Sequence, residues 1–169
     1  MKLSEGVETS IHCCAVLAGL EEQQTISGTD LADFHGVSAS YLLKHLKKLV
    51  AANVLESVPG PAGGFRLARP ADQITFLDIV LAVEGRAPAF RCSEIRRRGP
   101  SPLPDKAFPK PCGINAAMLK AERAWRDQLQ ATRLSDAVAD HMTNSDAAVV
   151  QRGCAFIEAA RRPRQSPEA

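Results

Sequence analysis

The chain has 169 residues, of which 45% are hydrophobic and 24% are charged, and its formal net charge is +2. This balance is typical of a globular protein and excludes a polycation, so a nucleic-acid site would need a local concentration of basic residues. The N-terminus has no apolar signal-peptide core, and no apolar run approaches the roughly 20 residues that span a bilayer, so we expect a cytoplasmic protein without a membrane partner. Five cysteines in a reducing compartment argue against a disulfide scaffold and leave metal or redox chemistry open.

The N-terminal half predicts three short helices, each preceded by a serine that can act as its N-cap. These serines are Ser4, Ser27 and Ser38. Apolar residues at helical spacing predict the helices over residues 5–18, 28–35 and 39–52. Gly36 lies in a tight turn between the second and third helices. Two helices joined by a short turn that contains glycine are typical of a helix–turn–helix.

A β-hairpin is expected next. Residues 54–58 and 65–68 alternate apolar and polar side chains on either side of a turn rich in glycine and proline. Thr75 can then cap a further helix over residues 76–83. These elements predict a mainly α fold with a small β-hairpin wing, that is, a winged helix–turn–helix DNA-binding domain over residues 1–84.

The second half opens with a loop, residues 85–112, that holds six of the eleven prolines and seven basic residues against two acidic ones. A loop of this length is usually functional or disordered. An apolar seam at spacings of three and four predicts a long packing helix over residues 113–132, followed by a short helix over 135–142. The seam consists of Ile114, Met118, Ala121, Trp125 and Leu129. We assign residues 113–142 to dimerisation and 143–169 to a C-terminal segment whose polar end, from Arg161, is expected to be disordered.

In a winged helix–turn–helix the second helix of the pair enters the major groove, with its first residues nearest the bases. Between Ser38 and Arg69 there are five basic residues and one glutamate, so positive charge is concentrated where this fold needs it. The expected DNA-binding residues are polar and basic side chains of the 39–52 helix and arginines beside the wing: Ser38, Ser40, Tyr41, Lys44, Lys47, Lys48, Arg66 and Arg69. A small helical domain with solvated lysines would also fit, but the combined order, charge and wing favour double-stranded DNA as the partner.

Four runs of sequence resemble the Rrf2 family of transcription regulators, of the IscR and NsrR type. They are VSASYL (37–42), LKKL (46–49), GPAGGFRLARP (60–70) and ITFLDIV (74–80). The resemblance covers about residues 1–134. It implies a homodimer held by the long helix, a palindromic operator and, in many members, an iron–sulfur cluster in the loop before that helix.

The cluster ligands depart from the usual family pattern of three cysteines. Only Cys92 and Cys112 lie in the loop, and Asn115 stands where IscR-like members have a histidine. Glu8 and His12, at positions i and i+4, share one face of the first helix and can bind one metal centre. The resemblance to redox-sensing members with a two-iron cluster implies the ligand set Glu8, His12, Cys92 and Cys112, and mixed ligation has a precedent in Rieske centres.

The predicted function is a redox-sensing transcriptional regulator, a homodimer that binds palindromic DNA and carries a [2Fe–2S] cluster. The same four ligands would also suit tetrahedral zinc. Two further possibilities are a regulator without a cluster that uses a thiol switch between Cys92 and Cys112, and a protein-interaction module that no longer reads DNA. An enzyme is not expected, because no substrate pocket, oxyanion donor or orienting residue can be named.

Overall fold

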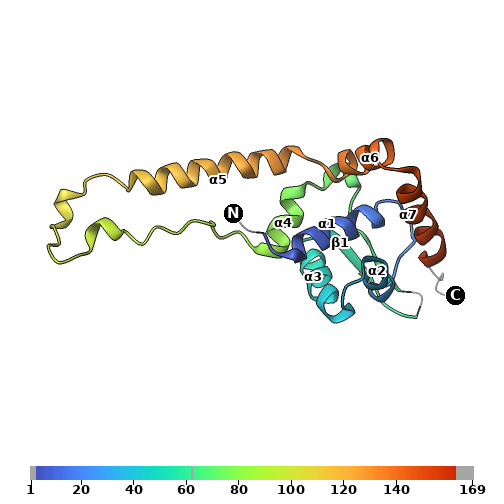
Figure 1. Cartoon of the computed structure of the whole chain (residues 1–169). Helices are drawn as coiled ribbons and strands as arrows, with labels where there is room; N and C mark the ends of the chain where they lie inside the picture. Colours follow the sequence, from blue (N-terminus) through green and yellow to red (C-terminus); the bar gives the residue numbers. More distant parts are fainter. Residues whose placement is uncertain (1–2, 62, 163–169) are drawn as a thin grey trace. The chain divides into compact units, whose positions relative to one another are not determined.

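The computed structural model describes residues 3–61 and 63–162. The chain divides into two units, whose described parts are residues 3–85 with 129–162 in the larger unit and residues 86–128 in the smaller one. The α-helices of both units and the first strand are labelled in Figure 1. No helix in the described residues is long and apolar enough to cross a membrane.

The larger unit contains the predicted helix–turn–helix and its wing. Its helices are α1 (Glu5–Leu17), α2 (Gly28–His35), α3 (Ala39–Ala51), α4 (Phe76–Glu84), α6 (Leu134–Asn144) and α7 (Ala147–Ala160). Its antiparallel hairpin consists of β1 (Leu55–Val58) and β2 (Gly64–Leu67). The core is formed by completely buried aliphatic side chains from these elements and their connections: Leu31, Leu42, Leu46, Leu49, Ile26, Ile74, Ile79 and Leu134. This arrangement confirms the predicted fold class, mainly α with a small β-hairpin wing.

Local capping signals explain where several of the helices begin. Ser27 and Ser38 accept hydrogen bonds from backbone N–H groups three residues ahead, at the starts of α2 and α3. Thr75 and Asp78 form a reciprocal capping box at the start of α4. Ser4 also precedes its helix, but its side chain makes no cap, because the hydroxyl donates to Glu84 Oε1 at 2.5 Å.

The wing is joined to the helix–turn–helix through backbone pairing. Strand β2 starts and ends one residue earlier than the predicted 65–68, and β1 starts one residue later than the predicted 54–58. Phe65 of β2 also exchanges two backbone hydrogen bonds with Ile26, which directly precedes Ser27, the N-cap of α2. A Cβ on Gly64 would lie 2.4 Å from the Ile26 carbonyl oxygen, so this close approach requires glycine.

The C-terminal segment differs from the prediction. Residues 147–160 form helix α7, capped by the side chain of Asp146, where no helix was expected. The end of the segment was expected to be disordered from Arg161, and this is wrong for Arg161 and Arg162, both of which make hydrogen bonds. Residues 163–169 lie outside the described residues.

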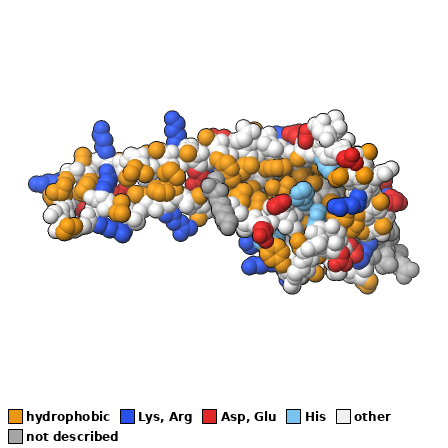
Figure 2. Space-filling model, in the orientation of Figure 1, with side chains coloured by type: hydrophobic (Ala, Val, Ile, Leu, Met, Phe, Trp, Pro, Cys, Tyr) orange, Lys and Arg blue, Asp and Glu red, His pale blue; other side chains and the backbone are white. Residues whose placement is uncertain are grey.

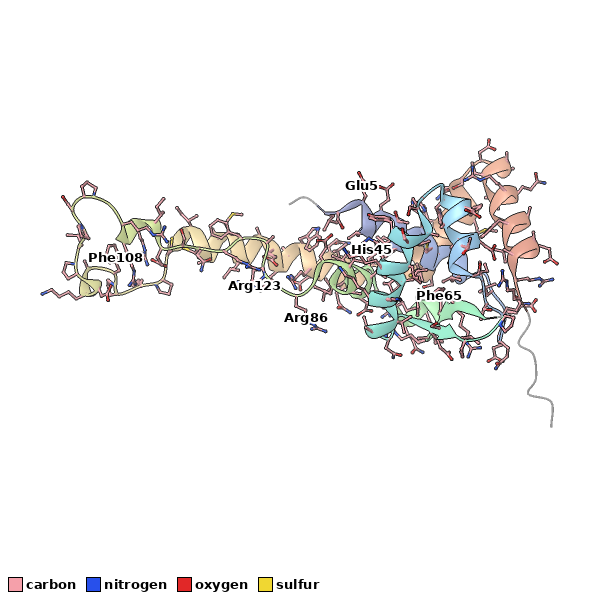
Figure 3. The ribbon with its side chains drawn as sticks, turned by 90° about the horizontal axis from the view of Figure 1, so that it is seen from below. Glu5, His45, Phe65, Arg86, Phe108 and Arg123 are labelled. Atoms are coloured by element: carbon pink, nitrogen blue, oxygen red, sulfur yellow. The ribbon has the colours of Figure 1, made fainter. Side chains whose placement is uncertain are left out.

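The smaller unit contains most of α5 (Gly113–Ala131) and the loop that precedes it. The loop has two short 3-10 turns, Ile95–Arg97 and Asp105–Ala107. The guanidinium groups of Arg96 and Arg97 lie 5.2 and 5.4 Å from the centre of the Phe108 ring, at distances typical of cation–π contacts. The loop is therefore folded on itself around Phe108, which is labelled in Figure 3.

Candidate DNA-binding surface and sensor loop

Helix α3 separates its apolar and polar side chains, as a recognition helix requires. Leu42, Leu46 and Leu49 are completely buried against the core. The predicted DNA-contacting residues on its other side are exposed: Ser38, Ser40, Tyr41, Lys44 and Lys47. Tyr41 is 37% exposed, and its ring packs edge-on against His45.

Lys48 does not share the exposure of the other two lysines. Its ammonium group donates to the carbonyl oxygen of Val83, in the last turn of α4, at 2.6 Å. The cation therefore satisfies a carbonyl at a helix C-terminus, where positive charge is favourable. The Lys48 side chain therefore links α3 to α4 in this structure. The exposed lysines of α3 are Lys44 and Lys47.

Arg66 of β2 and Arg69, which follows the wing, both form ion pairs with side chains of this chain. Arg69 donates to the carbonyl oxygens of Gln73 and Asn53 and forms an ion pair with Asp78 at 2.9 Å. Arg66 pairs with Glu56 across the hairpin, also at 2.9 Å. Arg66 thus pairs within the wing and Arg69 at the start of α4, and their contact with DNA stays a prediction.

A buried histidine connects the recognition helix to α1. His45 is only 7% exposed, and a Cβ placed on Gly6 of α1 would lie 2.4–2.8 Å from three atoms of its ring. Neither ring nitrogen has a hydrogen-bond partner among the described residues. Desolvation, with a smaller effect from the positive charges of Lys48 and Lys44, lowers the pKa of His45. The imidazole is therefore a neutral packing group between α3 and the backbone of α1 (Figure 3).

Glu8 and His12 are both exposed on α1, at the i and i+4 positions that sequence analysis paired. The His12 ring lies 6.0 Å, centroid to centroid, from the ring of His35 at the end of α2. Cys13 and Cys14, next along the same helix, are completely buried, and burial raises the pKa of Cys13 to about 12. Cys13 and Cys14 are therefore inert core residues rather than ligands.

The smaller unit brings Cys92 and Cys112 together although 20 positions separate them in sequence. Arg96 links the segment that contains Cys92 to the one that contains Cys112. Its guanidinium pairs with Glu94 and donates to the Lys110 carbonyl oxygen at 2.8 Å. Cys92 Sγ accepts the backbone N–H of Glu94 at 3.4 Å, and the Cys92 thiol lies 3.8 Å from Glu94 Oε1, to which it donates. Cys92 is also close enough to Cys112 to lower its pKa. The two sulfur atoms are thus neighbours at the start of α5.

Hydrogen bonds at the N-terminus of α5 favour the thiolate form of Cys112. Its pKa is lowered chiefly by the backbone N–H of Asn115. The N–H of Ile114, the Cys92 thiol and the charge of Arg96 add to this effect, which partial desolvation opposes. Asn115 stands at the position of a histidine ligand in IscR-like regulators, and here its backbone N–H stabilises the Cys112 thiolate. A thiolate beside a helix N-terminus is a good nucleophile and a good metal ligand.

The predicted four-ligand set is divided between the two units. Glu8 and His12 belong to the larger unit, and Cys92 and Cys112 to the smaller. Among the described residues, no group of three or more His, Cys, Asp or Glu side chains could hold a metal ion. The paired thiols with their N–H donors suit a thiolate-ligated metal, and they supply two of the ligands that such a centre needs.

A family model described as "Rrf2: Iron-dependent Transcriptional regulator" matches residues 3–140. The chain belongs to the Rrf2 family. Among curated Rrf2-like relatives, the HTH-type transcriptional regulator YffB of Lactococcus lactis is 39% identical over 122 residues, which cover 72% of this chain and 77% of YffB. Protein aau3 of Rhizobium meliloti is 38% identical over 112 residues, which cover 64% of this chain and 67% of aau3.

Solved structures show the same Rrf2 architecture. The oxidised form of Staphylococcus aureus CymR is 26% identical, with a TM-score of 0.58 over 79% of this chain and 93% of CymR. IscR of T. potens is 19% identical, with a TM-score of 0.62 over 89% of this chain and 96% of IscR, and this likeness concerns the fold alone. Family membership establishes this Rrf2 protein as a DNA-binding transcriptional regulator rather than an enzyme.

Proposed function

We propose that this Rrf2 regulator is a homodimeric redox sensor that binds palindromic DNA and holds a [2Fe–2S] cluster through Glu8, His12, Cys92 and Cys112. The observation that carries the proposal is the Cys92–Cys112 pair at the start of α5, with backbone N–H donors directed at its sulfur atoms. N–H donors stabilise thiolates and tune the reduction potential of iron–sulfur centres. Glu8 and His12, exposed and one turn apart on α1, would supply the remaining two ligands.

Dimerisation is supported by the uncovered apolar side of α5. This helix buries none of its side chains within the chain, and 69% of Ile114 and 43% of Met118 are exposed. Figure 2 shows hydrophobic side chains gathered along this unit. In water such a seam is stable when a second copy covers it. We propose that the Cys92–Cys112 loop of one protomer then meets Glu8 and His12 of the partner subunit.

A bound two-iron cluster would supply a one-electron change of charge. The residues of this chain would hold the centre and set its electrostatics. Arg96, whose charge acts on both thiols, would favour the more negative, reduced state. The N–H donors to Cys112 would also favour the reduced state. His12 as a ligand would raise the reduction potential relative to an all-cysteine centre, as in Rieske centres.

A thiol switch is the second candidate, favoured by the proximity of Cys92 to Cys112, whose pKa it lowers. The Cys112 thiolate would attack a hydroperoxide to give a sulfenic acid and an alcohol or water, and the Cys92 thiol would then displace water to form the disulfide. Each disulfide formed consumes one hydroperoxide, which is reduced by two electrons. CymR of S. aureus, 26% identical, is described in an oxidised form.

Anaerobic purification followed by visible spectroscopy and iron and sulfide analysis tests the proposal. We expect a coloured protein with two iron and two sulfide ions per cluster, the stoichiometry of this centre. Cys92→Ala and Cys112→Ala should abolish the colour. Cys154→Ala removes an exposed thiol outside the proposed site and should keep it, which makes it the matched control. His12→Ala should leave a labile cluster with a lower potential, and a wild-type spectrum and potential in this variant would refute the ligand assignment.

A colourless protein without iron or zinc would refute the cluster proposal and leave the thiol switch. That candidate predicts a disulfide between Cys92 and Cys112 after addition of one equivalent of hydroperoxide, identified by peptide mapping. Unreacted thiols after this treatment would refute the switch as well. Specific DNA binding, which follows from family membership, would stand in either case.

A further inference from the structure

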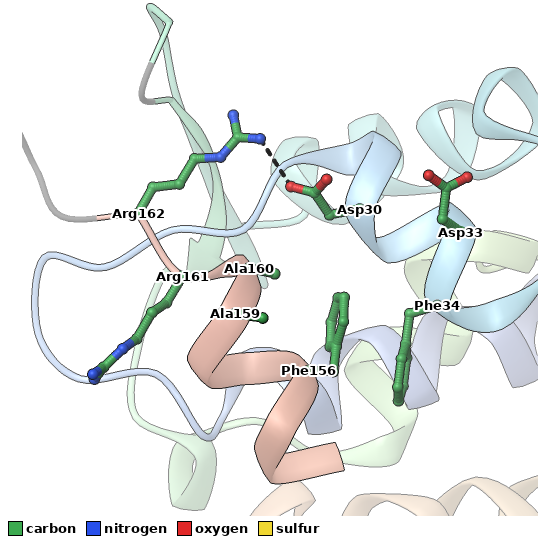
Figure 4. A pocket seen from close by; sticks show the side chains of 8 residues that line it. All are labelled: Asp30, Asp33, Phe34, Phe156, Ala159, Ala160, Arg161 and Arg162. Carbon is green, nitrogen blue, oxygen red and sulfur yellow. Dashed lines mark hydrogen bonds and ion pairs between the residues drawn. The ribbon is translucent and has the colours of Figure 1, made fainter. Parts of the chain in front are cut away.

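Helix α7 lies beyond residues 3–140, the part of the chain that matches the family model, and it packs against the helix–turn–helix. Phe156 stacks on Phe34 of α2, with ring centroids 4.1 Å apart. Arg152 lies over the same Phe34 ring at 5.2 Å. These contacts fix the C-terminal end of α7 beside α2, with an open hollow between them that is shown in Figure 4.

The chain leaves α7 and immediately pairs with the segment that leads into α2. Thr25 and Arg162 exchange two backbone hydrogen bonds, of 3.1 and 2.9 Å. The neighbouring residue, Ile26, makes the equivalent pair of bonds with Phe65 of β2, of 3.1 and 2.8 Å. Arg162 therefore continues the backbone pairing that joins the wing to the helix–turn–helix.

The side chain of Arg162 also contacts both the wing and α2. One terminal nitrogen donates to Asp30 Oδ2 at 2.9 Å, drawn as a dashed line in Figure 4. The other donates to the carbonyl oxygen of Pro61, at the tip of the wing, at 3.4 Å. Asp30 in turn accepts a hydrogen bond of 2.6 Å from Ser27, the N-cap of α2. A single guanidinium thus connects the wing tip with the first turn of α2.

We propose that α7 and Arg162 form a latch that holds the wing in register with the helix–turn–helix, and that Arg162 is a positioning residue for DNA binding. Both terminal nitrogens of Arg162 are bonded to protein acceptors, so the side chain acts on DNA through the wing and α2. The wing and the recognition helix contact DNA together, so a wing held in one position avoids an ordering cost on binding. This proposal depends on DNA binding and is independent of which redox centre the protein carries.

Arg162→Ala in the full-length chain tests the latch, with Arg161→Ala as the matched control. Arg161 is the preceding residue, and its side chain pairs with Glu158 and Glu21 rather than with α2 or the wing. The probe is a duplex selected by the wild-type protein from a random-sequence pool, labelled for fluorescence anisotropy over a range of salt concentrations. Circular dichroism confirms that both variants are folded.

We expect Arg162→Ala to weaken DNA binding about three- to tenfold, which corresponds to a part-exposed, charge-assisted contact. The slope of log affinity against log salt should stay at the wild-type value, because no phosphate contact is lost. Hydrogen exchange at the Thr25 amide, which donates to Arg162, should become faster in Arg162→Ala and remain unchanged in Arg161→Ala.

Two results would overturn the latch. If Arg162→Ala keeps both the wild-type DNA affinity and the wild-type exchange rate at the Thr25 amide, the Arg162 side chain does not position the wing. A slope reduced by about one unit would make Arg162 a direct phosphate contact. Failure of the wild-type protein to select any duplex would contradict the DNA-binding function itself, and the exchange measurement would still decide whether Arg162 pairs with Thr25 in solution.

Discussion

Replacement of Gly6 by alanine should destabilise the protein through a collision inside the larger unit. The added Cβ would lie 2.4 Å from His45 Cε1 and within 2.8 Å of two further ring atoms. The ring is buried and in edge-on contact with Tyr41, so it cannot swing out without moving α3 or exposing the core. Overpacking of this kind costs about 1–3 kcal/mol, and the better helix propensity of alanine returns about 0.5–1 kcal/mol. A net loss of up to about 2.5 kcal/mol follows from these two opposing effects.

Urea unfolding followed by far-UV circular dichroism, at one fixed protein concentration, measures this loss. In a His45→Ala background the collision is gone, so the same glycine substitution should become neutral or stabilising. Gly153→Ala is the matched control, because this glycine lies within α7 with no atom within 4 Å of an added Cβ, and it should stabilise the protein. An equal cost of Gly6→Ala with and without His45 would refute the collision.

Three further predictions concern DNA binding, dimerisation and pH. Loss of both exposed lysines of α3, Lys44 and Lys47, should weaken binding to all duplexes and reduce the salt slope by about one unit for each phosphate contact, as measured by anisotropy. Trp125→Ala should shift the protein toward monomer in sedimentation at micromolar concentration, with a cost of about 3–5 kcal/mol if a partner completes the burial of the ring. Because the pKa of His45 is lowered in the folded state, the free energy of unfolding should fall as pH decreases below about 6.5, the ordinary pKa of histidine. That fall should be smaller in His45→Ala.

Features that depend on a few neighbouring residues could be predicted from sequence. The caps at Ser27, Ser38 and Thr75 involve partners three residues away, so the starts of α2, α3 and α4 follow from local rules. The wing was predicted for a similar reason, since its turn and its alternating strands are adjacent in sequence. The same local rules predicted a cap at Ser4, and this prediction was wrong because the Ser4 hydroxyl bonds to Glu84, 80 positions away.

The candidate site depends on contacts that no local pattern contains. Helical periodicity places Lys48 on the polar side of α3, and only the approach of α4 shows that its ammonium bonds to Val83. The conformation of Arg69 likewise depends on the distant backbone of Asn53. Cys92 and Cys112 have no ligand spacing that identifies them, because their proximity follows from the fold of the intervening loop around Arg96. Helix α7 was missed, and Phe34, on which its Phe156 stacks, lies far away in sequence.

Helix α1 provides a physical connection between the proposed sensor and the recognition helix. Its exposed side carries Glu8 and His12, while on its buried side the backbone of Gly6 lies against the ring of His45 in α3. Close-packed contacts transmit displacement because neither side can be compressed. If a change of charge at the proposed cluster moves His12, the rigid helix carries Gly6 with it, and α3 must follow through His45. We therefore expect the DNA affinity of Gly6→Ala, whose α1–α3 contact is already displaced, to respond less to reduction than that of the wild-type protein. An undiminished redox response in this variant, measured by anaerobic anisotropy, would show that the signal reaches α3 by another route.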